Sequence, residues 1–291
     1  MKHQFARRAC SAILMPALLA LVGGCSTQPV ASSSAPQAQT PSEVKAKTTE
    51  STAAVETKAV ESNVIEPKAM EALQKMGGFL GTLKTFEVSF KVSKDEVLDS
   101  GQKVMVDGTS ELTVQTPDHF HFSTKIDEAY RDLQFFYNGK TFTIYGNTNK
   151  FYATVPAPAT IHELLDVAQE RYDIELPFRD LFSWGTDKAD VAAIQSAIYI
   201  GPTKIDGVPY DHYAFRNVDV DWQIWIQQGK KPLPGKLVIT TMDEDEHPQY
   251  VSNMSWNLSP KINNKAFTFV PPKDSHKIDF AVVEVESENI K

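Results

Sequence analysis

The pattern of apolar and polar positions changes near residue 84, from the spacing of a helix to the alternation of strands. Between residues 67 and 83, apolar side chains recur every three or four positions, which predicts a helix with one apolar stripe. Pro67 suits the first turn of that helix, because an N–H there would have no partner within the helix. Gly77 and Gly78 interrupt the stripe at a cost of about 1 kcal/mol each relative to alanine. The pair therefore indicates a break or a close approach of another backbone.

Beyond residue 85, alternation of apolar and polar positions dominates, as in half-buried strands. Phe86 to Val92 shows it first, and it continues to about Tyr152 and again over residues 197–258. Asn138-Gly139 lies between two apolar runs and is the strongest hairpin signal in the chain. Since short turns join these runs, we expect antiparallel neighbours arranged in a meander.

A helical insert separates the two alternating regions. Thr160 and Glu163 have the spacing of a capping box, and the apolar positions that follow predict a helix over residues 161–172. Shorter helices are expected over residues 177–182 and 187–194.

Together these elements predict an α+β fold with one folded domain over residues 67–280. Its main feature is a large antiparallel sheet with one apolar face. Helices cannot lie within the sheet, so they must cover that face. A domain of this length can enclose a well-buried core. Residues 281–291 are expected to form a C-terminal tail.

The first 25 residues have the pattern of a secretory signal. Three basic residues begin it, an apolar run covers residues 12–22, and small residues lead into Cys25. The run is shorter than the roughly 20 residues needed to cross a bilayer. Cys25 at the cleavage point makes the stretch resemble a bacterial lipobox, which implies a signal peptide over residues 1–24 and acylation of Cys25, with palmitate among the acyl groups. The alternative is an ordinary signal peptide with a chance cysteine.

A segment of low apolar content follows the cysteine. Residues 26–66 contain no Phe, Trp, Tyr or Gly and are built mostly of Ala, Ser, Thr and Pro. Such a segment cannot bury enough apolar surface to offset the entropy of ordering it. We therefore expect residues 25–66 to form a disordered tether between the lipid and the domain.

Charge and cysteine content exclude several classes of protein. The whole chain has a formal net charge of −8, and loss of the signal leaves 26 basic against 37 acidic residues, or −11. Nucleic-acid binding needs basic patches, so it is not expected. Attachment to an anionic membrane by charge is not expected either. Acyl groups on the chain must therefore attach it to the membrane. With Cys10 lost and Cys25 acylated, no thiol remains for a disulfide or a cysteine metal site.

Four stretches in the folded region together resemble a bacterial family of predicted periplasmic proteins of unknown function, which has a LolA/LolB-like fold. They are FYNGKT, VDWQIWI, PLPGK and FTFVPP, at residues 136–141, 220–226, 232–236 and 267–272. The resemblance implies a sheet curved into an incomplete barrel, with helices covering its concave face around an apolar cavity. LolA and LolB use that cavity for the acyl chains of lipoproteins in transit.

Two histidines are the nearest candidates for a metal site. His119 and His121 are two residues apart on an expected strand, so their imidazoles share a face and could reach one ion. A third ligand, such as Asp118 or His212, would be needed. The alternative, which we favour, is that both are polar positions alternating with buried phenylalanines. We therefore predict no metal site.

The acidic positions also have a plain structural explanation. Residues 243–246 are all acidic but lack the alternating spacing of a calcium loop, so a solvated hairpin tip is expected. Asp219 and Asp221 share a strand face, as a catalytic carboxylate pair would, but are expected on its wet outer side. Trp225 falls on the same polar face. Packing under a neighbouring loop is expected for it, with a sheet edge or a contact surface as alternatives.

These inferences favour a lipid-anchored periplasmic binding protein without enzymatic activity or a cofactor. It would hold an acyl chain, a lipid or a lipoprotein between the sheet and the helix over residues 161–172, and Ser26 favours an anchor in the outer membrane. The predicted ligand-binding residues are Phe86, Phe90, Phe120, Phe122, Leu164, Leu165, Trp222 and Ile224.

Three alternatives remain open. The same side chains could pack together and leave no cavity. The protein could be an envelope sensor or scaffold that binds a protein partner on its surface. It could also be a metal-dependent hydrolase that uses the two histidines.

Overall fold

The fold is built on one open sheet, which a computed structural model describes within residues 63–126, 131–184, 186 and 191–281. The predicted signal peptide, Cys25 and nearly all of the predicted tether lie outside the described residues, as does the tail from residue 282. Among the described residues, no helix is long and apolar enough to cross a membrane.

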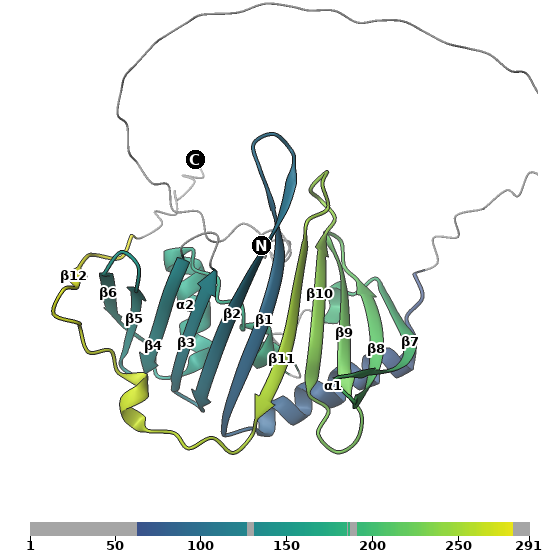
Figure 1. Cartoon of the computed structure of the whole chain (residues 1–291). Coiled ribbons are helices and arrows are strands. Elements are labelled where there is room, and N and C mark those ends of the chain that lie inside the picture. Colours follow the sequence, from purple (N-terminus) through teal and green to yellow (C-terminus); the bar gives the residue numbers. More distant parts are fainter. Residues whose placement is uncertain (1–62, 127–130, 185, 187–190, 282–291) are drawn as a thin grey trace, which may run out of the picture. The chain divides into compact units, whose positions relative to one another are not determined.

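Twelve strands form the sheet in the order β12-β6-β5-β4-β3-β2-β1-β11-β10-β9-β8-β7 (Figure 1). Their bounds are β1 (Thr85–Val97), β2 (Lys103–Gln115), β3 (His119–Ile126), β4 (Arg131–Asn138), β5 (Thr141–Gly146), β6 (Phe151–Pro156), β7 (Ser196–Ile205), β8 (Val208–Arg216), β9 (Val220–Gln227), β10 (Pro234–Thr241), β11 (Gln249–Asn257) and β12 (His276–Lys277). Neighbours are antiparallel except β12 and β6, which run parallel. The predicted large antiparallel sheet is confirmed, and it is not closed, since β12 and β7 lie at opposite ends.

Two meanders make up the sheet and meet where β1 pairs with β11. One runs from β1 to β6 and the other from β7 to β11, each in chain order. β1 and β11 are paired at eight positions, among them Val88 with Trp256. The chain therefore leaves β6 near one end of the sheet and re-enters it as β7 at the other end. The helical insert between them crosses the whole sheet (Figure 1).

Turn chemistry fixes the hairpin predicted at Asn138-Gly139. The Asn138 side-chain oxygen accepts from the backbone N–H of Lys140 at 3.1 Å and of Thr141 at 2.9 Å. Gly139 has a φ of +75°, a conformation that side chains disfavour. The sequence prediction of β4, β5 and their turn is therefore confirmed.

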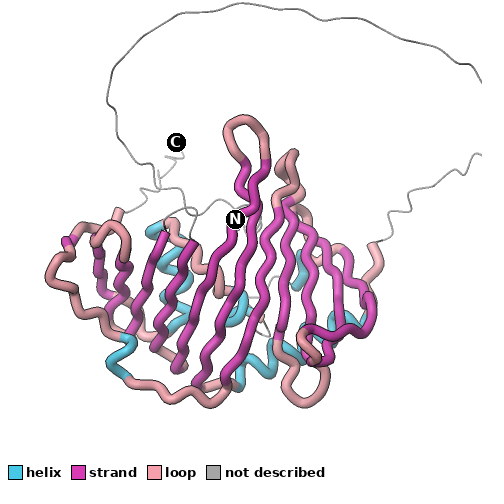
Figure 2. The backbone as a smooth tube through the Cα atoms, in the orientation of Figure 1, coloured by secondary structure: helices cyan, strands magenta, loops and turns pink. Residues whose placement is uncertain are grey.

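The three α-helices of the described residues lie on one side of the sheet (Figure 2): α1 (Pro67–Thr82), α2 (Ile161–Tyr172) and α3 (Asp180–Ser183). There is also a 3-10 turn at Val191–Ala193, and a second at Asn264–Phe267 packs on the opposite face, with the Phe267 ring 5.2 Å from His119. The capping box at the start of α2 is present: Thr160 Oγ1 accepts from the Glu163 N–H, and the Glu163 carboxylate accepts from the Thr160 N–H. α3 is shorter than predicted, because residues 177–179 form a turn rather than helix. Of the third expected helix, residues 187–190 lie outside the described residues.

One core fills the space between the helices and the sheet. The apolar stripe of α1 is buried in it, together with Ile161, Leu164 and Leu165 of α2. Phe178 lies between helix and sheet, with its ring 5.2 Å from that of Phe120 and 4.8 Å from that of Phe122. α1 continues through Gly77 and Gly78, so the possible break there does not occur.

Both ends of the described chain cover an edge of the sheet. Before α1, the Val64 carbonyl accepts from the Ala197 N–H, and the Glu66 N–H donates to the Ala197 carbonyl, both at 2.8 Å. The Glu66 carboxylate also accepts from the Tyr199 N–H at 3.0 Å. At the other end, β12 pairs with β6, and Phe280 packs on the rings of the α2 and β5 aromatics. Within the described residues, contacts with the sheet thus include residues just before Pro67.

Candidate functional site

A cleft of about 370 Å³ lies where the helices meet the sheet. The C-terminal half of α1 forms one wall, and the start of α2 with α3 forms the other. β1 begins at its base. Pockets that bind small ligands have volumes of about 300–1,000 Å³. The apolar part of the lining comes mainly from Leu80, Leu83, Phe86, Ile161, Leu181, Phe182 and Trp184.

Three glycines of α1 border this cleft: Gly77, Gly78 and Gly81. A Cβ atom placed on Gly78 or on Gly81 would meet no atom within 4 Å. Close packing therefore does not require glycine at either position, although each costs a helix about 1 kcal/mol relative to alanine. Both residues are exposed, so the space beside them is open to solvent.

Aromatic packing builds the opposite wall. The Phe182 ring lies 6.3 Å from the Phe86 ring at the base and 6.1 Å from the His162 ring of α2. The same ring lies 6.1 Å from Phe178, and Phe86 lies 5.5 Å from Trp256. α3 has four residues and no side-chain cap, so these contacts rather than helix propensity hold it in place.

An arginine joins α3 to α2. Arg179 Nη1 donates to the Leu165 carbonyl at 2.7 Å, and Nη2 donates to the Asp166 carboxylate, also at 2.7 Å. The start of α2 is fixed as well, because the Ile161 N–H donates to the Pro117 carbonyl at 2.8 Å. The wall opposite α1 is thus tied to the β2–β3 loop.

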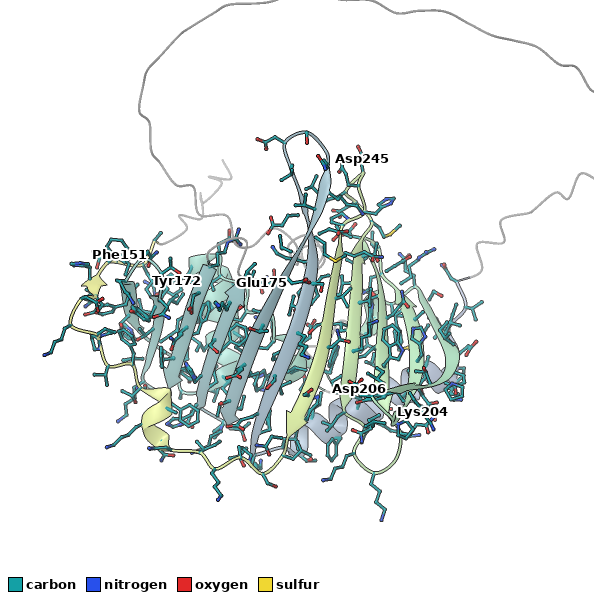
Figure 3. All side chains as sticks on the ribbon, in the orientation of Figure 1. Phe151, Tyr172, Glu175, Lys204, Asp206 and Asp245 are labelled. Carbon is teal, nitrogen blue, oxygen red and sulfur yellow. The ribbon has the colours of Figure 1, made fainter. Side chains whose placement is uncertain are left out.

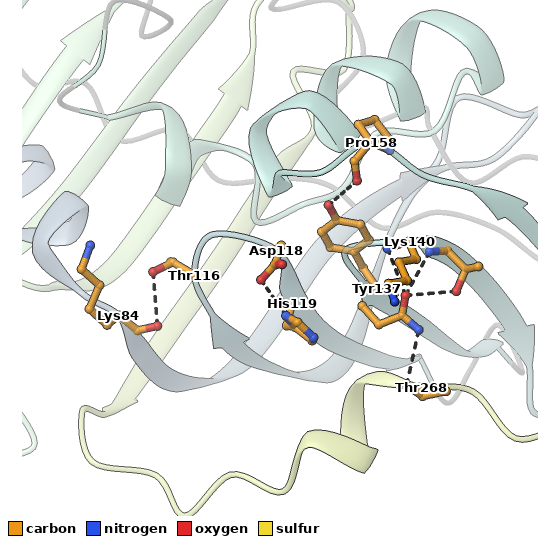
Figure 4. Close-up of polar contacts among 10 residues, drawn as sticks. Lys84, Thr116, Asp118, His119, Tyr137, Lys140, Pro158 and Thr268 are labelled. Carbon is orange, nitrogen blue, oxygen red and sulfur yellow. Dashed lines mark hydrogen bonds and ion pairs between the residues drawn. The ribbon is translucent and has the colours of Figure 1, made fainter.

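Few polar residues are among the described residues that line the cleft, and none of these is acidic. Lys84, Thr116, His162 and Thr186 contribute to the lining. The Thr116 N–H donates to the Lys84 carbonyl at 2.8 Å, and Thr116 Oγ1 lies 3.4 Å from the same oxygen (Figure 4). The backbone at this rim is therefore held in place, while the Lys84 side chain is exposed.

The eight predicted ligand-binding residues all lie in or against the core between helices and sheet, but the cleft includes one of them, Phe86. Six are buried away from its lining: Phe90, Phe120, Phe122, Leu164, Leu165 and Ile224. Trp222 is partly buried, stacks on Phe215 at 4.2 Å and donates to the Asn217 side chain at 2.9 Å. Binding roles for all eight residues, Phe86 included, stay predictions.

Trp225 packs on its strand neighbours on the outer face. Its ring stacks on the His212 ring at 3.9 Å with an interplanar angle of 8°, and Lys236 Nζ lies 4.8 Å from its centroid. Cross-strand packing of this kind, rather than a covering loop, accounts for a tryptophan on the polar face.

His119 and His121 have separate partners. His119 Nδ1 lies 2.7 Å from Asp118 Oδ1 (Figure 4), and its ring meets Phe267 edge-on at 5.2 Å. His121 Nε2 lies 3.3 Å from the Gln134 side-chain oxygen. Within the described residues there is no group of three His, Cys, Asp or Glu placed to hold a metal ion. The absence of a metal site stays a prediction.

The acidic positions lie where solvent reaches them. Residues 243–246 form the turn between β10 and β11, and Figure 3 shows Asp245 at its tip. Asp221 accepts two hydrogen bonds from Arg216, both at 2.6 Å. An ion-paired carboxylate of this kind has a structural explanation without catalysis.

A family model describes most of the folded region. The model for predicted periplasmic proteins, DUF2092, matches residues 69–281. The chain belongs to this family. The family expected from the four sequence stretches is therefore confirmed, and its description as predicted periplasmic agrees with the compartment expected from the N-terminal signal.

Solved structures give more distant likenesses. An uncharacterized conserved protein from Thermus thermophilus is 10% identical, with a TM-score of 0.42 over 73% of this chain and 99% of that one. LprF from Mycobacterium bovis is 15% identical, with a TM-score of 0.41 over 72% and 99%. A LolA superfamily protein from Nitrosomonas europaea is 10% identical, with a TM-score of 0.33 over 69% and 97%. These values are too low to support a function. No curated protein matches the chain.

Several cleft residues are not among those predicted from the sequence. Lys84, His162 and Trp184 belong to this group, and no pattern in the sequence singles them out. Gly77 and Gly81 do carry a signal. They lie four residues apart, on one face of a helix that is otherwise rich in apolar residues.

Burial of His121 predicts that the stability of the protein depends on pH in mild acid. Burial lowers the pKa of His121 below its usual 6.5, against the opposing effects of Gln134 and Glu111. The unfolded chain takes up this proton near pH 6.5, whereas the folded chain does so only at lower pH. Stability should therefore fall as the pH decreases from about 6.5.

Replacement of His121 by glutamine should reduce that pH dependence. Thermal unfolding followed between pH 7 and pH 5 would measure it. The matched control is His276→Gln, at an exposed position on β12, which should change the slope less. An equal slope in wild type and His121→Gln would contradict the assignment.

Proposed function

We propose that the protein is a lipid-anchored binding protein of the periplasm that holds an apolar ligand in the cleft between α1, α2 and α3. The ligand would be an acyl chain, as a free lipid or as part of a lipoprotein, and no chemical step is involved. The observation that carries this proposal is the cleft itself. Its volume of about 370 Å³ and its largely apolar lining suit a hydrocarbon chain.

The composition of the cleft walls supports binding rather than mere imperfect packing. Elsewhere the inner layer is closely filled, with Phe120, Phe122 and Phe178 essentially inaccessible to solvent. At the cleft, by contrast, α1 presents Gly78 and Gly81 to open space. Both positions are exposed, and glycine at them lowers helix stability although close packing does not require it.

The proposed attachment rests on the N-terminal sequence. A lipobox ending in Cys25 would leave the domain on a tether of about 40 residues, which as a flexible chain would span roughly 35 Å. The cleft could then reach ligands that lie beyond the membrane surface. The family's description as predicted periplasmic supports the compartment.

Tryptophan fluorescence can test ligand binding directly. Of the four tryptophans, Trp184 lines the cleft, whereas Trp225 stacks on the outer face. Addition of palmitate or of a neutral monoacylglycerol should change the emission by displacing water from Trp184. Trp184→Phe should remove most of that change, and Trp225→Phe should preserve it.

A protein that shows no emission change and no calorimetric binding with either lipid would contradict the proposal. The alternative of an envelope sensor or scaffold, which binds a protein on its surface, would then be favoured.

Filling the cleft should weaken binding without weakening the fold. Gly81→Leu would place a side chain in open space, since a Cβ at that position meets nothing within 4 Å. Leucine favours helix over glycine by about 0.8 kcal/mol, so the melting temperature should stay equal or rise. Ligand affinity should fall about tenfold, equivalent to about 1.4 kcal/mol.

The matched control is Gln74→Leu, at an exposed position of α1 outside the cleft. It should leave affinity unchanged. Equal affinity in wild type and Gly81→Leu would place the ligand elsewhere.

Acylation of Cys25 is tested by Cys25→Ser. Without a thiol the chain cannot receive the lipid, and the protein should move from the membrane fraction to the soluble fraction. Mass spectrometry of the N-terminal peptide should show acyl groups in wild type alone. Membrane attachment that persists in the variant would refute the anchor while leaving the cleft untouched.

A further inference from the structure

We infer that the ligand of the cleft is a single-chain amphiphile with a negatively charged head group, which pairs with the ammonium of Lys84. This inference rests on the proposed function and adds the class of ligand. It starts from the charges at the cleft. Lys84 lines it, His162 lies on the opposite wall, and no Asp or Glu is among the described lining residues.

The described lining residues include no acidic side chain, although the chain as a whole is acidic. Acidic residues outnumber basic ones by 37 to 29, for a formal net charge of −8. Among the described lining residues, one lysine and no carboxylate thus give a local reversal of the overall charge. A positive charge at this position attracts an anion.

Lys84 is not used in an ion pair within the described part of the chain. Three other lysines near it in sequence are paired: Lys75 lies 3.5 Å from Glu71, Lys94 lies 2.6 Å from Glu96, and Lys103 lies 3.1 Å from Asp95. Lys91 is, like Lys84, outside these pairs, but it lies away from the cleft. Lys84 has no such partner among the residues described, and its side chain is exposed. Its ammonium is available to a ligand.

The backbone holds Lys84 at the mouth. The residue lies between the end of α1 and the start of β1, and its carbonyl is fixed by Thr116 (Figure 4). Leu83 and Phe86, on either side in sequence, contribute apolar surface to the cleft. A lysine so placed can lay its methylenes on apolar atoms and keep the ammonium in water. The ligand would match it with a buried chain and an exposed anionic head.

The test compares three ten-carbon ligands that differ in the head group alone. Isothermal titration calorimetry would measure decanoate, decyl phosphate and decanol binding to the full-length chain carrying Cys25→Ser, which needs no detergent. A solvent-exposed ion pair of this type should favour the anions over decanol by about threefold to fivefold. The preference should shrink in 1 M NaCl.

Lys84→Met is the decisive variant, because it removes the charge and keeps an apolar stem. It should abolish the preference for anions and leave decanol affinity unchanged. Lys91→Met is the matched control, at an exposed lysine of β1 outside the cleft, and should preserve the preference.

Each outcome decides between the claims. A preference confined to decanoate or to decyl phosphate supports the inference and identifies the head group. Decanol binding as tightly as the anions, or a preference that survives Lys84→Met, overturns the inference and leaves the cleft as an apolar site. Failure of all three ligands to bind overturns the inference together with the proposed function.

Discussion

The chain has to pass from β6 near one end of the sheet to β7 at the other, and this connection governs how the apolar face is covered. α2 and α3 lie on that path, while α1 runs from the β7 edge towards β1 at the centre. The sheet is open, so its inner face would meet water without these helices. Phe178 and Leu164 fill the path with side chains that leave the sheet phenylalanines inaccessible. The cleft lies where α1 and the insert approach each other.

Where α1 approaches the helical insert, two of its exposed residues are glycines that lower the stability of the helix. Leucine or alanine at Gly78 and Gly81 would favour the helix, and neither position is sterically restricted. A sequence that keeps glycine there gives up helix stability along one border of the cleft. This loss is typical of functional sites, where a local preference is overridden for the sake of the site. Binding energy from an apolar ligand would offset part of the loss.

Short-range patterns determined how much of the fold could be predicted. Alternation in β1 and β9, the turn at Asn138-Gly139 and the capping box at Thr160 each depend on neighbours within a few residues, and the structure contains all of them. β12 was missed, because a two-residue parallel pairing with β6 leaves no periodic signal. The cleft could not be located from the sequence, because its position depends on how far α1 stands from the insert. The place of Lys84 and Trp184 beside the cleft depends on that distance alone.

The pairing of residues 64–66 with β7 has a mechanical consequence. Any pull on the chain from its N-terminal side acts first on the hydrogen bonds that join Val64 and Glu66 to Ala197, and on the Glu66 contact with Tyr199. The pairing is parallel, so a single residue, Ala197, bonds to both Val64 and Glu66. Residues 64–66 would therefore bear a pulling force before α1 does. Tension on the N-terminal chain would have to break this pairing before reaching the helix whose glycines border the cleft.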